Sequence, residues 1–242
     1  MQNKKNFSTK AVAVVLAAGL LVGGTVGGTV AWLTAKTEEV TNTFTVGKIQ
    51  IALTETDAED GAKTYSFVPG DTLAKDPKVT VTKDSEDHYL FVKAVVENNE
   101  CTAGGNTVNP IIDWEIASGW KYCGTVDGLS ENATSVESYK DGIYYFYRVV
   151  SESKNDQSFY VLEGKHTCDD STSCNCETIN GVVTVSPDVT EAMIGTINTS
   201  GKNPTLKFSA AAVQSVNLAE GTDAFAKVVA ELPGEFYTKA SN

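Results

Sequence analysis

Apolar and polar residues alternate in several short runs of this chain. In segment 90–97 the even positions are all apolar, which gives one wholly apolar face. A period of two is typical of a β-strand with one face in a core. Similar alternation occurs in 79–82 and 206–212, 182–185 is a shorter candidate, and 143–150 carries aromatic side chains on both faces. Polar loops separate these runs, which predicts an all-β antiparallel β-sandwich.

One short C-terminal helix interrupts this pattern. Phe225, Val228, Val229 and Leu232 recur at the spacing of one helical face, Thr222 and Asp223 can cap its start, and Pro233-Gly234 ends it. We expect this apolar stripe to pack against the core. The connection from Glu97 to Tyr139 and the Cys-rich loop around Asp169 are expected as loop insertions at the rims of the sandwich.

The first residues predict export. Lys4, Lys5 and Lys10 precede an apolar stretch from Ala11 to Val22, as in a signal peptide. Small residues end this region, and we place cleavage between Ala31 and Trp32. The alternative is an uncleaved anchor, since residues 11–33 could span roughly 30 Å of hydrocarbon if they stayed helical. The four glycines after Val22, at positions 23, 24, 27 and 28, weaken such a helix and favour cleavage.

The strand that follows changes its apolar face. Phe44 and Val46 share one parity, whereas Ile49, Ile51 and Leu53 share the other. A slip of one residue reverses every side chain of a strand, so Gly47-Lys48 must hold a bulge, a kink or a change of partner. A bulge within one strand is the simpler interpretation. The alternative is that 41–46 forms a separable strand, which pairs with a sheet edge of another molecule through Phe44 and Val46.

Several motifs together resemble those of the TasA/camelysin family of exported Gram-positive proteins. The resemblance rests on Gly28 to Thr34 followed by Thr41 to Gly47, on the Pro-Gly-Asp turn of 67–71, on the aromatic strand of 142–147, and on Ala211-Ala212-Val213-Gln214. It implies a jelly-roll or Ig-like form of the sandwich. It also implies processing by a SipW-type signal peptidase and a structural role in the extracellular biofilm matrix or at the cell surface.

The resemblance further implies a mode of assembly. Family members that build fibres insert the segment after the cleavage site into the next subunit as a donor strand. The chain would then comprise a signal peptide (1–31), a donor segment (32–46) with Phe44 and Val46 as anchors, and a sandwich domain (47–242). Its partners would be further copies of itself, the signal peptidase and paralogous matrix proteins. A surface adhesin or an accessory subunit that caps fibres is an alternative.

Charge narrows the range of partners. The chain has 19 basic and 31 acidic residues, and removal of residues 1–31 leaves a net charge of −15. Such a surface repels nucleic acid and anionic lipid, so contact with a membrane is expected only before signal cleavage. Surface Ca²⁺ could gather on it, although Asp57 to Gly61 lacks the spacing of a calcium loop. No cofactor is otherwise predicted.

The five cysteines allow at most two disulfides within one molecule. Cys101 and Cys123 flank the apolar run 111–114 and could staple it. A polar loop holds His166, Cys168, Cys174 and Cys176, which could form either a disulfide or a metal site. Because its spacing differs from that of zinc knuckles and the protein is exported, the disulfide is favoured.

Catalytic chemistry is not predicted. The camelysin branch is classed with metallopeptidases, so a cell-surface peptidase is an alternative function. His88 and His166 are the only histidines, however, and neither belongs to a His-Glu-x-x-His motif. We expect His88, within the polar run 84–89, to be a solvated turn residue. No catalytic residue is therefore assigned.

Overall fold

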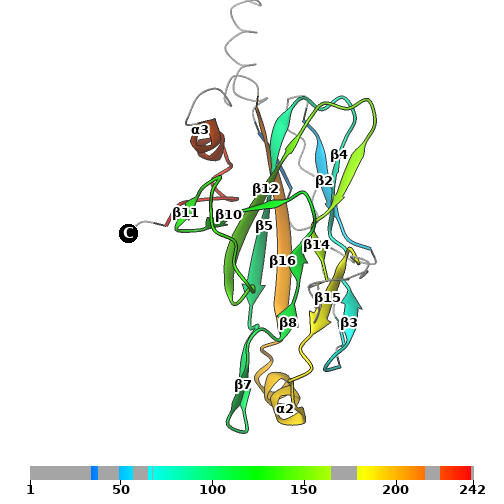
Figure 1. Cartoon of the computed structure of the whole chain (residues 1–242), viewed down its shortest axis with the longest axis vertical. Coiled ribbons are helices and arrows are strands. Elements are labelled where there is room, and N and C mark those ends of the chain that lie inside the picture. The colour runs from blue at the N-terminus through cyan, green and yellow to red at the C-terminus, as the bar shows by residue number, and fades with distance from the viewer. Residues whose placement is uncertain are drawn as a thin grey trace, which may run out of the picture.

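The computed structural model describes residues 34–37, 49–56, 65–66, 68–164, 179–215 and 224–240, with the backbone alone for 34–37. Within these residues the protein consists mostly of antiparallel strands in packed layers, with helices α2 and α3 near opposite ends of its long axis (Figure 1). The predicted all-β antiparallel sandwich with a short C-terminal helix is confirmed.

The main sheet has six strands in the order β1-β16-β5-β12-β10-β11. β5 lies at its centre and pairs along its whole length with β16 and along most of its length with β12. The strands are β1 (Thr34–Thr37), β16 (Thr205–Gln214), β5 (His88–Glu97), β12 (Gly142–Val150), β10 (Lys121–Thr125) and β11 (Gly128–Leu129).

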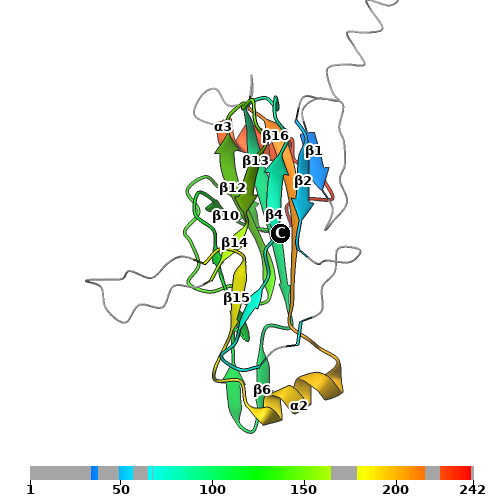
Figure 2. The same cartoon turned by 90° about the vertical axis from the view of Figure 1, so that its right-hand side faces the viewer.

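A second layer faces this sheet. It contains the three-stranded sheet β13-β4-β2, formed by β13 (Gln157–Tyr160), β4 (Lys78–Val81) and β2 (Ile51–Thr54). Smaller sheets extend the structure toward α2 (Figure 2). They comprise β3 (Thr72–Ala74), β15 (Val182–Val185) and β8 (Ile112–Asp113); β14 (Leu162–Glu163) and β9 (Glu115–Ile116); and the hairpin of β6 (Cys101–Ala103) and β7 (Asn106–Val108).

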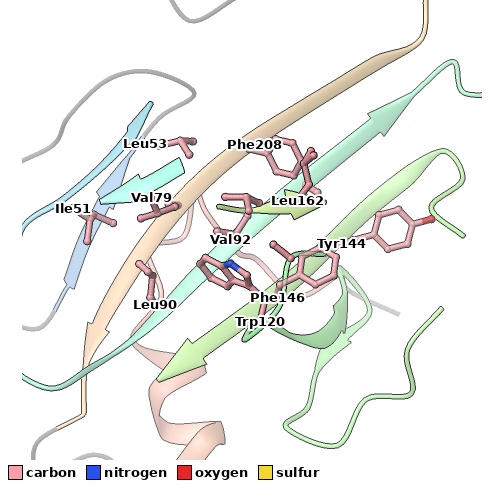
Figure 3. Close-up of a cluster of buried hydrophobic side chains, with 14 of the residues drawn as sticks. Ile51, Leu53, Val79, Leu90, Val92, Trp120, Tyr144, Phe146, Leu162 and Phe208 are labelled. Atoms are coloured by element: carbon pink, nitrogen blue, oxygen red, sulfur yellow. The ribbon is translucent and has the colours of Figure 1, made fainter. Parts of the chain in front are cut away.

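The principal core lies between the two layers (Figure 3). Leu90, Val92, Ala94 and Val96 are all at most 3% exposed, as the alternation in β5 predicted. Val79 and Val81 of β4 meet them from the second layer. Trp114 joins the same cluster, as do Phe146 of β12 and Phe208 of β16 from the main sheet itself. Burial of a large apolar side chain contributes about 1.5–3 kcal/mol, so this face supplies much of the driving force for folding.

A second core lies on the other face of the main sheet, under α3 (Ala224–Ala230). Phe225 and Val228 of this helix cover Phe91, Tyr145 and Tyr147. The aromatic side chains on both faces of β12 are thereby explained, because each face belongs to a different core. The predicted C-terminal helix is confirmed, and Thr222 and Asp223, its predicted caps, lie outside the described residues.

The second helix, α2 (Glu191–Ser200), was not predicted from the sequence. The Thr190 hydroxyl accepts a hydrogen bond from the Met193 amide at 3.4 Å, and Gly201 ends the helix with a φ of 68°. Met193 and Ile197 pack in a third core cluster with Cys101 and Val108.

The connection from Glu97 to Tyr139 was expected as a loop insertion at a rim of the sandwich. It forms the β6–β7 hairpin at one rim, and it also contains β10, which joins the main sheet.

Candidate assembly edge

The outermost described strand on one side of the main sheet is β1. It pairs antiparallel with β16, from Thr34 opposite Val213 to Thr37 opposite Ala210. β1 covers four of the ten residues of β16, whereas β5 pairs with all ten on the other side. In Figure 2, β1 lies beside β16 at the edge of the sheet, close to β2.

The part of β16 that receives β1 is made of small residues. Ala210, Ala211, Ala212 and Val213 are each 0% exposed, because the two faces of this strand belong to the two large cores. Their side chains are therefore committed to the interior of the subunit, and β1 is held through backbone hydrogen bonds along the edge. Such an edge accepts any extended segment of suitable register. It coincides with the Ala211-Ala212-Val213-Gln214 motif.

The chain changes sheets between β1 and β2. β1 belongs to the main sheet, whereas β2 pairs with β4 in the second layer. Ile49, Ile51 and Leu53 are 2–4% exposed, so the predicted apolar face of this segment is confirmed. Ala31, Trp32, Phe44, Val46, Gly47 and Lys48 lie outside the described residues, and their roles stay predictions.

A buried polar cluster of Gln214, His88 and Glu86 lies at the end of β16, just beyond the residues that pair with β1. Gln214, the neighbour of Val213, lies opposite His88 across the β16–β5 ladder, and it donates from Nε2 to the Glu86 carboxylate. His88 Nδ1 lies 2.6 Å from the Glu86 carbonyl oxygen, while His88 Nε2 and Gln214 Oε1 are buried and have no hydrogen-bond partner among the described residues. The prediction that His88 is a solvated turn residue is wrong, since it is 0% exposed.

The physical reason is the register of β5. His88 continues the even-numbered inward face of Leu90 and Val92, so it enters the core although polar residues surround it in sequence. Burial lowers its pKa below the usual 6.5, because a charged imidazole loses its hydration there; the Glu86 carbonyl and the Asp87 charge oppose this shift. His88 is thus held neutral beside the edge at neutral pH.

The suggested link between Cys101 and Cys123 is wrong. Both are free and buried, Cys101 under α2 and Cys123 under α3, in separate core clusters. Burial also raises the pKa of the Cys123 thiol. The sequence interval suggested a staple, but β10 carries Cys123 into the main sheet while β6 holds Cys101 in a hairpin at the far end.

The predicted Pro-Gly-Asp turn is present before β3. The Asp71 amide donates to the Val68 carbonyl oxygen at 3.0 Å, and Gly70 adopts a φ of 84° that side chains rarely tolerate. The aromatic strand of the same resemblance is β12, and its Ala-Val-Gln strand is the end of β16. These motifs lie at structurally defining positions of the sandwich.

The described part of the chain shows neither a metal-binding cluster nor a membrane-spanning helix. No group of three or more His, Cys, Asp or Glu residues among the described residues is placed to hold a metal ion. His166, Cys168, Cys174 and Cys176 lie outside these residues, as do Asp57 to Gly61. None of the described helices is both long and apolar enough to cross a membrane.

These features define the class of the molecule as an antiparallel β-sandwich with a short N-terminal strand at the edge of its main sheet. The protein families, characterised proteins and solved structures compared with the chain include no match. Its function is therefore inferred from the sequence and from this edge.

Proposed function

We propose that this protein is an exported structural component of the extracellular biofilm matrix, whose subunits join by donating their N-terminal strand. The proposal combines the resemblance found in the sequence with one observation, the pairing of β1 with the buried end of β16. Because this pairing runs through the backbone, the same strand from a neighbour would make equivalent hydrogen bonds. A head-to-tail contact of this kind extends without closing when its rotation does not close a ring.

The extent of the edge favours a longer donated strand. Among the described residues, Thr205 to Ser209 of β16 pairs only with β5. A donor that continued the register of β1 would set residues 38–42 against this stretch, with Phe44 and Val46 beyond the start of β16. Signal cleavage between Ala31 and Trp32 would free the donor, which makes a SipW-type peptidase the expected partner in export.

Strand exchange can be tested by mixing two variants. The five native cysteines are replaced by alanine, and cysteine is introduced by Ala35→Cys in one protein and by Ala212→Cys in another, since these positions face each other. Exchange between subunits brings the new thiols of different molecules together, so oxidation should give a covalent heterodimer. A protein with both substitutions is the control for pairing within one chain.

The result separates the functions. Heterodimers in the mixture, together with fibres formed by residues 32–242 and lost without 32–46, support strand donation. Closure within the double variant and no heterodimer in the mixture would contradict it, and would leave a monomeric adhesin or accessory subunit. Equal fibre formation with and without residues 32–46 would also exclude the donor mechanism.

A further inference from the structure

Arg148 is the only arginine among the 19 Lys and Arg residues of the chain, and it lies between two aromatic rings. Its guanidinium carbon is 3.8 Å from the centroid of the Phe159 ring and 5.3 Å from that of Trp120. Phe159 belongs to β13 and Trp120 to the turn before β10. Three separate parts of the chain thus form a slot around one cation.

The slot is fixed by its backbone. A Cβ atom on Gly119 would lie 2.7 Å from Arg148 Nη2, and the φ of Gly119 is +87°, so this position combines two requirements for glycine. Trp120 Nε1 donates to the Tyr160 carbonyl oxygen at 2.8 Å and ties the turn to the end of β13. The guanidinium is therefore held in place and does not sweep through solvent.

No anion meets this cation in the described part of the chain. Within it, the Arg148 side chain forms neither an ion pair nor a hydrogen bond, and its Nε is buried without a partner. Glu163, near the same turn, accepts from the Ser118 amide at 3.2 Å. Burial lowers the pKa of the guanidinium, since desolvation opposes its charge. A partly desolvated cation without a counter-ion is costly, which favours an external anion.

The slot opens at unpaired strand edges. β10 begins opposite Tyr147, so in the described residues Arg148 to Val150 of β12 pair only with β5, and β13 pairs only with β4. Arg148 itself is only half-buried, so its side chain keeps contact with solvent beside these edges. In the order of the main sheet, this side of β12 faces away from β1.

We infer that the Arg148 slot binds an aspartate or glutamate carboxylate of a second copy of this chain. The planar guanidinium can present its two terminal nitrogens to both oxygens of a carboxylate, while the rings hold its plane. Charge complementarity selects the occupant, because each copy carries 31 acidic residues. The inference rests on the proposed self-assembly, and adds a contact on the side of the subunit away from β1.

The contact of Arg148 with a second copy can be tested through the self-association of residues 32–242. Sedimentation velocity and the critical concentration for fibres measure this self-association. Arg148→Gln should raise that concentration at least about tenfold, a change that corresponds to 1.4 kcal/mol. Arg148→Lys keeps the charge but lacks the planar fork, so its critical concentration should lie between those of the wild type and Arg148→Gln. Lys154→Gln is the matched loss of one charge, since the Lys154 side chain is 79% exposed and, among the described residues, pairs only with Asp84 and Glu152 on the surface.

A competition experiment covers the case in which Arg148→Gln does not fold. Acetate in place of chloride, at equal ionic strength, should raise the critical concentration of the wild-type chain, because it occupies the slot. If the wild-type chain stays monomeric, both the proposed function and this inference fail. If it assembles but acetate has no effect, or a folded Arg148→Gln assembles as the wild type does, only the Arg148 contact is excluded.

Discussion

Asn99 and Ile112 hydrogen-bond to each other as two strands do. The Asn99 side chain donates from Nδ2 to the Ile112 carbonyl oxygen at 2.9 Å, and the Ile112 amide donates to Asn99 Oδ1 at 2.7 Å. Nδ2 also donates to the Tyr139 carbonyl oxygen at 3.1 Å, and Asn99 is 1% exposed. One buried amide therefore joins the beginning, middle and end of the connection between β5 and β12.

Replacement of Asn99 by aspartate should be strongly destabilising. Asp keeps the acceptor but loses both donated hydrogen bonds and buries a carboxyl group, so we expect the free energy of unfolding to fall by roughly 3 kcal/mol. Urea unfolding followed by circular dichroism measures this change. Asn155→Asp, at an exposed position, is the matched control and should change it by less than about 0.5 kcal/mol. Equal effects of the two substitutions would refute the bridging role.

His88 should make stability depend on pH. Its pKa in the folded protein lies below that of the unfolded chain, so as pH falls below about 6.5 the unfolded state takes up more protons and stability declines. The full stability is present above this pH. Glu86, Asp87 and Gln214 are the polar and charged residues that face the imidazole.

The measurement uses a His166→Gln background, which leaves His88 as the single histidine. Urea unfolding between about pH 7.5 and 5.5 should then show a decline that is absent after His88→Gln, since glutamine does not titrate there. A parallel decline in both proteins would assign the effect to the carboxylates. The test concerns the stability of the subunit and is independent of the assembly mechanism.

The strands were predictable where one side of the chain faces a core. Leu90 to Val96 shows this directly, because a strict period of two survives burial between two sheets. α2 was missed because Glu191–Ser200 contains Gly195 and two threonines, and only Met193 and Ile197 mark its buried face. Its signals were local, namely Thr190 before the helix and Gly201 after it.

The environment of single polar residues was less predictable. The polar run around His88 suggested a turn, although its parity with Leu90 already indicated the inward face. Arg148 lies within a recognisable aromatic strand, but its neighbours Trp120 and Phe159 come from distant segments. The chain topology brings these three side chains into contact, and no local pattern in the sequence predicts that contact.

The two described cysteines should be inert in the folded protein. Cys101 and Cys123 are buried and free, and an alkylating reagent attacks the exposed thiolate. We expect a Cys168→Ser, Cys174→Ser, Cys176→Ser variant to take up iodoacetamide only after unfolding in urea, at two sites per chain. Mass spectrometry gives the count. Fast modification of the native protein, or a Cys101–Cys123 disulfide under mild oxidation, would contradict the structure.

Gly119 should be coupled energetically to Arg148. Gly119→Ala places a Cβ atom against Nη2 and also strains a backbone with a φ of +87°. Gly104→Ala isolates the second effect, because Gly104 has a φ of +62° and no atom near its Cβ position. We expect the control to lose about 1 kcal/mol and Gly119→Ala about 1 kcal/mol more, since the guanidinium must leave its place between the rings.

A double-mutant cycle with Arg148→Gln separates these contributions. Without the guanidinium, Gly119→Ala should destabilise only as much as Gly104→Ala does, which gives a coupling energy of about 1 kcal/mol between positions 119 and 148. Urea unfolding of the four proteins of the cycle, with Gly104→Ala in both backgrounds, provides the values. Additive effects would mean that Gly119 serves the turn alone. Coupling would instead establish that the missing Cβ atom of this glycine makes room for the guanidinium of the sole arginine beside its two rings.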